Sequence, residues 1–239
     1  MTDPDADAAG AGINYQRLYE FRFQDVEQRA RQAVWDEIAP WLYRALARPA
    51  RVLDPAAGRG EFIRAVPAPE RWAIDIVDHE SDGWSPDIRR IVGDARRCEL
   101  PDDYFDGVLV SNFLEHFASQ EDIGAFLQGM ARCLRPGGRI AVLGPNFRYC
   151  MREYFDCADH TIPLTHVAVS EHLYAAGFEI ERVIPRFLPF SFRSRTPRAP
   201  WLVRAYLGLP LAWRLVGRQF LVIGRAPSVG PASSVGDAQ

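Results

Sequence analysis

The sequence predicts an α/β protein built on a doubly wound, mostly parallel seven-stranded sheet with helices on both faces. Strand-like and helix-like segments alternate from about residue 50 to 184, as parallel strands joined by helical crossovers do. The strand-like segments are short and apolar, with "FDGVLVSN" the clearest. The 239 residues suit one large domain with additions.

The first expected element is helical and covers residues 13–48. Its apolar residues recur at spacings of three and four, which favours one apolar helix face. They are Val26, Ala30, Ala33, Val34, Ile38, Leu42 and Leu46. We expect Pro40 to kink or divide this element, because proline lacks the N–H that a helix interior needs.

Seven strands are expected in the remaining chain. They are "ARVLD", "RWAIDIV", "IRRIVGDA", "FDGVLVSN", "RIAVLGPN", "FEIERVI" and "QFLVIGRA". Two clear helices lie between them: "EDIGAFLQGMARCL", which "RPGG" should stop, and "HVAVSEHLYAAGF", which ends near Gly177.

Segments that do not fit the alternation of strands and helices set the domain boundaries. Residues 1–12 are acidic and small and predict a disordered lead-in, and residues 227–239 predict a disordered tail. Residues 13–226 then form one domain. Within it, 13–48 is a candidate lid, and 146–165 and 186–218 are candidate acceptor-side insertions because they are longer than ordinary connections.

Composition excludes some classes of chemistry. All 28 basic residues are arginine, so the chain has no lysine nucleophile or Schiff base. The net charge of −3 gives no overall attraction to nucleic acid. The four cysteines form no C-x-x-C pair and no secretory signal is evident, which favours a reduced, cytoplasmic setting. The sequence spells out no metal site and does not reveal the oligomeric state.

The stretch "VLDPAAGRGEF" at 52–62 has the features of a ligand-binding turn. Gly58 and Gly60 allow a tight bend and a close approach of the backbone to a ligand. A helix from about Glu61 would point its N-terminus at that ligand. A plain structural bend is the alternative interpretation of the same residues.

Acidic residues at the next two strand ends favour a nucleoside-type ligand. Asp75 lies 21 residues after Asp54, the separation at which an acid accepts hydrogen bonds from a ribose. Asp94 lies 19 residues further on and could accept from the exocyclic amine of a purine. Because the ends of parallel strands meet at one edge, the three carboxylates are expected together.

Four segments, "VLDPAAGRGEF", "IDIVD", "VGDARRCELPDDYFDGVLVSNFLEHF" and "CLRPGGRIAVLGPNF", resemble the successive motifs of class I S-adenosylmethionine-dependent methyltransferases. The resemblance covers about residues 50–184 and implies a Rossmann-like methyltransferase fold with S-adenosylmethionine as cofactor. The residues it implies at the cofactor are Asp54, Ala56, Gly58, Gly60, Asp75, Ile76, Asp94, Ala95, Asn112 and Phe113. Ala56 stands where the first glycine of the family motif normally lies.

The resemblance also divides these residues by role. Gly58 and Gly60 would border the methionine part, with Asp54 beneath the loop near the amino group. Asp75 would hold the ribose and Ile76 would pack on the adenine. The adenine amino edge would meet Asp94 and Ala95, and the sulfonium would lie beside Asn112 and Phe113.

Histidines are the candidate bases for an acceptor hydroxyl, because their unperturbed pKa lies near neutrality. His160 and His166 lie in the first insertion, and His116 lies beside the expected methyl position. A structural role is the alternative for each of them. Further acceptor-site candidates are Tyr149, Tyr154 and Asp156 in the insertion and, in the N-terminal lid, Tyr15, Tyr19 and Arg22.

The second insertion is basic and apolar. Between residues 182 and 225 the chain has nine arginines and no acid, interleaved with Leu, Trp, Phe and Pro. A solvated basic face, a site for an anionic acceptor, or contact with an anionic membrane presenting a lipid-linked acceptor would each explain it. We expect methyl transfer to a small-molecule or carbohydrate-like acceptor, at oxygen. A non-methylating cofactor-binding protein and, less favoured, an RNA methyltransferase are the alternatives.

Overall fold

A computed structural model describes residues 14–24, 27–79, 83–189 and 199–228. The predicted lead-in 1–12, most of the predicted tail and Val26 lie outside these residues. So does the stretch 190–198 within the second insertion.

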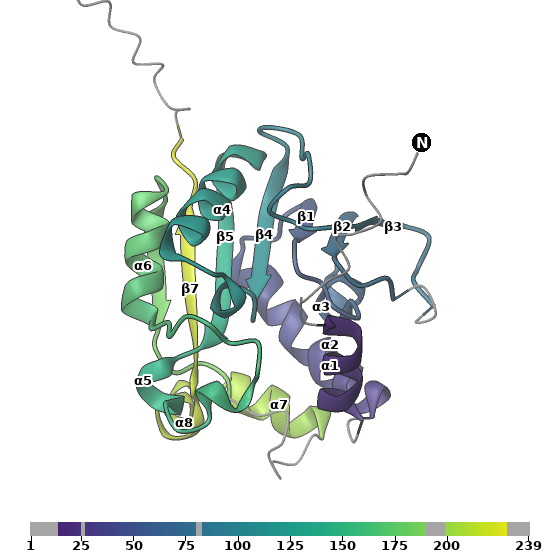
Figure 1. The fold of residues 1–239 in the computed structure, drawn as a ribbon, viewed down its shortest axis with the longest axis vertical. Coiled ribbons are helices and arrows are strands. Elements are labelled where there is room, and N and C mark those ends of the chain that lie inside the picture. The colour runs from purple at the N-terminus through teal and green to yellow at the C-terminus, as the bar shows by residue number, and fades with distance from the viewer. Residues whose placement is uncertain (1–13, 25–26, 80–82, 190–198, 229–239) are drawn as a thin grey trace, which may run out of the picture.

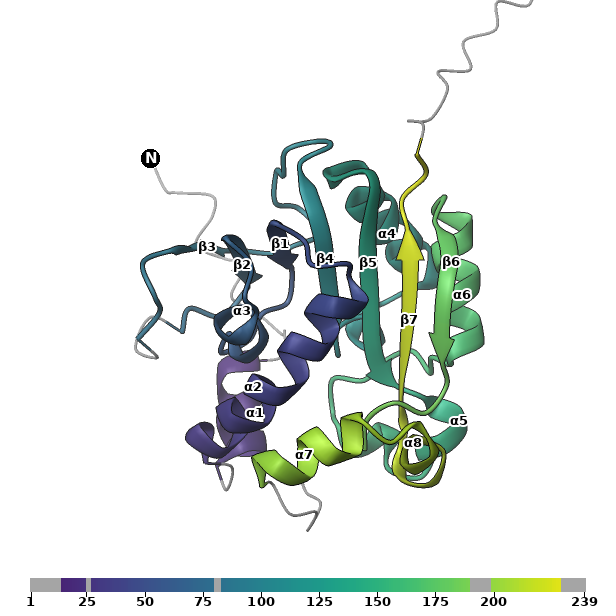
Figure 2. The ribbon, with the colours of Figure 1, turned by 180° about the vertical axis from the view of Figure 1, so that it is seen from behind.

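Seven strands of the described chain form a single sheet in the order β3-β2-β1-β4-β5-β7-β6 (Figures 1 and 2). Their bounds are β1 Arg51–Asp54, β2 Glu70–Asp75, β3 Ile88–Val92, β4 Phe105–Ser111, β5 Leu134–Pro145, β6 Glu179–Ile184 and β7 Gln219–Arg225. Only β7 runs antiparallel to its neighbours in these pairings. The predicted mostly parallel seven-stranded sheet is confirmed, and its strand order reverses between β1 and β4, where open α/β sheets bind ligands.

Helices cover both faces of the sheet. They are α1 Tyr15–Phe23, α2 Gln28–Ala45, α3 Glu61–Ala65, α4 Gln120–Cys133, α5 Phe147–Cys150, α6 His166–Ala175, α7 Pro200–Leu207 and α8 Pro210–Val216. Figure 1 shows α4 and α6 in front of the sheet, and Figure 2 shows α2 and α7 in front of the opposite face.

Each face has its own buried core because successive strand residues point to opposite sides. Val108 and Val110 of β4 join the core beneath α4 and α6. Leu109, between them, joins the core that contains Leu42 of α2 and Trp213 of α8. The all-apolar centre of this strand is therefore explained by burial on both faces.

Two boundary predictions need correction. Pro40 lies inside a continuous α2, and the N-terminal helical segment divides instead between Phe23 and Gln28. Proline removes the hydrogen bond to the carbonyl four residues earlier, and Asp36 at that position is exposed, where water can replace it. The helix before "RPGG" ends at Cys133, as predicted, but the strand expected to begin at Arg139 begins earlier, at Leu134, and includes this stretch, with Gly137 at a φ of 76°.

Both insertions contain helices. Residues 146–165 hold α5 and the 3₁₀ helix Tyr154–Asp156, while the described part of 186–218 holds α7 and α8. Among the described residues, no helix combines the length and the apolar character needed to cross a bilayer.

Candidate functional site

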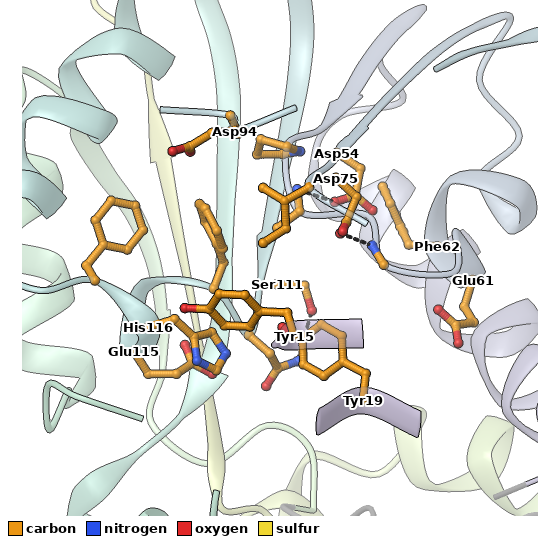
Figure 3. A pocket seen from close by; sticks show the side chains of 18 of the residues that line it. Tyr15, Tyr19, Asp54, Glu61, Phe62, Asp75, Asp94, Ser111, Glu115 and His116 are labelled. Atoms are coloured by element: carbon orange, nitrogen blue, oxygen red, sulfur yellow. Dashed lines mark hydrogen bonds between the residues drawn. The ribbon is translucent and has the colours of Figure 1, made fainter. Parts of the chain in front are cut away.

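A cavity of about 240 Å³ lies at the carboxyl ends of β1, β2, β3 and β4, beneath α1. Asp54, Asp75 and Asp94, from three successive strand ends, all line it (Figure 3). The expected meeting of the three acids at one sheet edge is thus found in the structure. Ala56, Gly58, Ile76, Ala95, Asn112 and Phe113 line the same cavity.

The loop after β1 turns at two glycines and is hydrogen-bonded to Asp75 at the end of β2. Gly58 has a φ of 54°, and its N–H donates to Oδ2 of Asp75 at 2.7 Å. Gly60 has a φ of 80°, and a Cβ there would lie 2.4 Å from the Trp84 ring, so glycine is required at this position. Ala56 is absent from the positive-φ residues of the described chain. An alanine therefore fits where the family motif has glycine.

Asp75 and Ile76 form the second wall. Oδ1 of Asp75 accepts from the N–H of Val77 at 2.9 Å. Each carboxylate oxygen accepts one backbone N–H and keeps a second lone pair for a ligand. The neighbouring Ile76 is 49% exposed and lines the cavity, which gives this wall an apolar surface.

Asp94 is paired with a neighbouring arginine. Arg96 donates to both carboxylate oxygens of Asp94, with Nε 2.8 Å from Oδ1 and Nη2 2.6 Å from Oδ2. The hydrogen bond from Arg96 holds the pKa of Asp94 below its usual value. An amine at this edge must therefore share the carboxylate with a guanidinium.

Asp54 differs because it is 3% exposed and has no arginine among its hydrogen-bond or ion-pair partners in the described chain. Burial raises its pKa to about 8, and the charges of Asp75 and Glu61 add to the rise. The N–H of Ala56, 3.3 Å from Oδ1, opposes it. A bound ammonium group would supply the missing positive charge.

Asn112 and Phe113 follow β4 directly. Asn112 adopts a φ of 49°, a left-handed conformation that is uncommon outside glycine and concentrates at functional sites. Phe113 packs edge-on against Phe117 and Phe126, at centroid distances of 5.0 and 5.3 Å. The cavity wall beside β4 is thereby rigid and aromatic.

Helix α1 contributes Tyr15, Tyr19 and Arg22 to the cavity. Arg22 forms an ion pair and hydrogen bond with Asp159, whose side chain is fully buried. Burial opposes ionisation of Asp159, but the Arg22 hydrogen bond and nearby positive charge outweigh it and lower the pKa. This contact fastens α1 to the first insertion, so the structure places the predicted lid residues over the cavity.

A cluster of Glu115, His116 and His160 lines the cavity. Figure 3 labels Glu115 and His116, which lie near Tyr15. Nδ1 of His116 lies 2.9 Å from the carbonyl oxygen of Asp159. Burial, helped by the charge of His116, lowers the pKa of His160 to about 4, which leaves its ring neutral at pH 7. Burial raises the pKa of Glu115.

Four predicted acceptor-site residues lie outside this cavity. His166 begins α6, where Nδ1 is 2.9 Å from the Asn146 amide nitrogen. Tyr154 is fully buried and its hydroxyl donates to the Ile162 carbonyl and accepts from the Leu164 N–H, a structural role. Tyr149 stacks against the His166 ring, and Asp156 is exposed.

Other cavity residues were not predicted. Glu61 pairs with Arg31 of α2 at 2.9 Å, and Arg96 and Glu115 face the cavity beside residues that were predicted. Glu115 had a usable signal, since it adjoins His116 in "NFLEHF". For Arg31 the sequence offered no such signal, because only the packing of α2 against α3 brings Arg31 to the cavity.

Comparison with known proteins identifies part of this architecture. A family model described as "Methyltransferase domain" matches residues 53–142. The chain is 35% identical over 99 residues to the demethylmenaquinone methyltransferase of Mycobacterium sp. (strain KMS), covering 38% of this chain and 40% of that protein. It is 29% identical over 162 residues to a ubiquinone/menaquinone biosynthesis C-methyltransferase of Caulobacter sp. (strain K31), covering 60% and 56%.

The chain thus spans about half the length of these curated relatives. Among solved structures, a S-adenosylmethionine-dependent methyltransferase from Archaeoglobus fulgidus superposes with a TM-score of 0.61 and 20% identity. The match covers 89% of this chain and 100% of that one, and it shows a shared fold.

Proposed function

We propose that this chain, whose residues 53–142 match a methyltransferase family model and whose fold is shared with a S-adenosylmethionine-dependent methyltransferase, is a class I enzyme of that kind and transfers a methyl group from S-adenosylmethionine to a small-molecule acceptor. One observation carries this proposal. Asp54, Asp75 and Asp94 reach a single cavity from three successive strand ends, beside a glycine turn that leaves room for a ligand.

Asp54 and Asp75 suit two different parts of the cofactor. Asp54 is buried without a positive partner and would receive the ammonium group, while the open lone pairs of Asp75 would accept from the ribose hydroxyls. The exposed face of Ile76 would pack against the adenine ring. Bound in this way, the cofactor would direct its methyl group toward the wall formed by Asn112, Phe113 and the histidine cluster.

Calorimetric titration with S-adenosylhomocysteine tests the cofactor site. Asp75→Ala should lose charge-assisted hydrogen bonds, a cost of about 1.5–3 kcal/mol or roughly 10–150-fold in affinity. Asp78→Ala is the matched control, since Asp78 is about half exposed and pairs with Arg90 outside the cavity. Equal affinities in the two folded variants would contradict the ribose assignment.

For the transfer itself we propose attack by an acceptor hydroxyl that loses its proton within the histidine cluster. Positioned proton transfer contributes about 10²–10⁴-fold in rate. A pKa of about 4 makes His160 a weak base, which favours an acceptor whose hydroxyl is itself acidic, such as a phenol or enol, over a sugar alcohol. His116, held by Asp159, is the neighbouring candidate.

The atom methylated is part of the same proposal. A phenolate is nucleophilic at oxygen and also at the adjacent ring carbon, and the Caulobacter relative is named a C-methyltransferase. We favour oxygen because an exposed hydroxyl reaches a buried histidine cluster more readily than a ring carbon does. Incubation with a panel of phenols and quinols and NMR of the products would distinguish O-methyl from C-methyl.

The same incubation decides whether the chain is an enzyme. Formation of S-adenosylhomocysteine together with a methylated product supports the proposal. Tight cofactor binding without turnover on any extract or panel member would favour the alternative, a cofactor-binding protein that does not methylate. In an active protein, His160→Ala should lower kcat, and His172→Ala, which changes a histidine outside the cavity, should not.

A lipid-soluble acceptor is suggested by the surface of α7 and α8. Trp201, Leu209, Leu211 and Leu215 are between 59% and 79% exposed, and Arg214 is exposed beside them. Figures 1 and 2 place both helices at the end of the sheet toward which β4 points, the end that also holds the cavity. We propose that this face rests on an anionic membrane.

Sedimentation with lipid vesicles tests that contact. The protein should bind vesicles containing anionic lipid more strongly than neutral ones, and Leu211→Ser with Leu215→Ser should weaken binding. Tyr174→Ser, at a 76% exposed position on α6, is the control for losing an exposed large side chain. Equal sedimentation of the double variant and this control would contradict membrane contact.

A further inference from the structure

Three side chains with metal-binding chemistry converge at the acceptor side of the cavity. One ligand atom each from Glu115, His116 and His160 lies within 4.8 Å of the other two. Glu115 and His116 come from the 3₁₀ helix Leu114–His116 after β4, and His160 comes from the first insertion. All three line the cavity, so a metal ion held by them would face the acceptor.

Within this cluster, Glu115 is the residue whose buried carboxylate is least satisfied by the protein. It is 2% exposed, and its Oε1 is buried with no hydrogen-bond partner in the described chain. Leaving a buried carboxylate oxygen without a partner costs free energy that a cation would recover. The carboxylate therefore indicates that a positively charged ligand belongs beside it.

His116 is oriented as a metal-binding histidine would be. Its Nδ1 lies 2.9 Å from the Asp159 carbonyl oxygen and 3.4 Å from the carboxylate of the same residue, which is fully buried and paired with Arg22. Donation from Nδ1 leaves Nε2 with a free lone pair. Metal-binding histidines are commonly fixed in this way by a carbonyl or carboxylate on the other nitrogen.

We propose that Glu115, His116 and His160 bind one divalent transition-metal ion of the zinc class, with a coordination position left open toward the cavity. Two imidazoles and one carboxylate are the donor set of catalytic zinc sites, and they do not suit the oxygen-preferring Mg²⁺ or Ca²⁺. The site itself does not depend on the proposed function, but its catalytic role rests on it.

In that role the ion would bind the acceptor oxygen as a Lewis acid. Coordination lowers the pKa of a bound hydroxyl, which releases its proton to solvent. The oxygen then forms a bond to the methyl carbon while the carbon–sulfur bond breaks, and its electron pair moves onto sulfur to give S-adenosylhomocysteine. In this version of the proposed transfer, His116 and His160 would act as metal ligands in place of the base role given above.

Cobalt(II) is the probe, because its visible absorption reports the ligands of a zinc-class site. Chelator-treated full-length protein should bind one Co²⁺ per chain without sulfur-to-cobalt charge-transfer absorption. Glu115→Gln and His160→Gln should each weaken binding by at least about 10–100-fold. His172→Gln, which changes a histidine outside the cluster, should bind as the wild type does.

Two controls keep the result interpretable. S-adenosylhomocysteine affinity and melting temperature show whether each variant is folded. Cys157 lines the same cavity, so a charge-transfer band that Cys157→Ser removes would place the ion on sulfur and overturn the assignment. Absence of Co²⁺ binding by folded wild type, or unchanged binding by the cluster variants, would overturn it too.

The proposed metal site and the proposed methyl transfer can be refuted independently of each other. Methyl transfer that persists in chelator-treated protein without Co²⁺ binding would refute the metal site and leave the proposed function standing. Stoichiometric Co²⁺ binding lost in the cluster variants, in a protein that never methylates, would support the site and refute the function.

Discussion

Replacing Asp54 by asparagine should change how stability depends on pH. The Asp54 side chain is buried, and burial raises its pKa from 3.8 to about 8. The folded state therefore binds a proton that the unfolded state releases above pH 4. The contribution of Asp54 to the free energy of unfolding is fully present below pH 4 and is lost as the pH rises through 8.

The size of the effect follows from the same values. Between pH 5 and pH 8 the wild type should lose up to about 1.4 kcal/mol per pH unit from Asp54, or roughly 4 kcal/mol over three units. Asparagine does not titrate and can still accept the N–H of Ala56. The stability difference, variant minus wild type, should therefore grow with pH by on the order of 2–4 kcal/mol.

Urea unfolding followed by tryptophan fluorescence at pH 5, 6, 7 and 8 measures this difference. Asp78→Asn serves as the control, because Asp78 is half exposed and ion-paired with Arg90. A difference for Asp54→Asn that stays constant over this range would refute the reasoning, since it would mean that the buried carboxyl ionises normally.

Cofactor binding gives a second measurement of the same group. A bound ammonium should lower the pKa of Asp54, so binding near pH 7 should release a proton. Calorimetry in two buffers of different ionisation enthalpy detects that proton, and Asp54→Asn should abolish its release. Identical apparent enthalpies for the wild type in both buffers would contradict it.

Three further predictions concern the framework of the site. Gly60→Ala should lower the free energy of unfolding, measured by thermal unfolding, by about 1–3 kcal/mol, which is more than Gly58→Ala should. The reason is that a Cβ at position 60 meets the Trp84 ring, whereas one at position 58 meets open space. Equal losses in the two variants would contradict this. Tyr154→Phe should cost about 1–3 kcal/mol of unfolding free energy with unchanged cofactor affinity, because two buried backbone groups lose their partner; altered affinity would mean that the ring serves the cavity. Asp159→Asn should break the ion pair to α1 and speed proteolysis of that helix, whereas an unchanged cleavage rate would show that the pair does not hold α1.

The sequence by itself determined the sheet and its ligand edge. Period and apolar runs identified the strands, and parallel strands necessarily end together. Asp54, Asp75 and Asp94 could therefore be predicted at one cavity without knowing any side-chain contact. Gly60 was also predicted to border the ligand, but it does not line the cavity; its positive φ and the adjacent Trp84 ring give it a role in shaping the loop.

Only the tertiary structure decided the acceptor side. His160 lies in an irregular stretch of the first insertion, where no periodicity indicates direction, and His166 follows six residues later as the first residue of α6. Packing turns His160 into the cavity and His166 toward Asn146. Arg22 meets Asp159 across 137 residues of chain, a contact set by how α1 and the insertion fold over the sheet rather than by any local pattern.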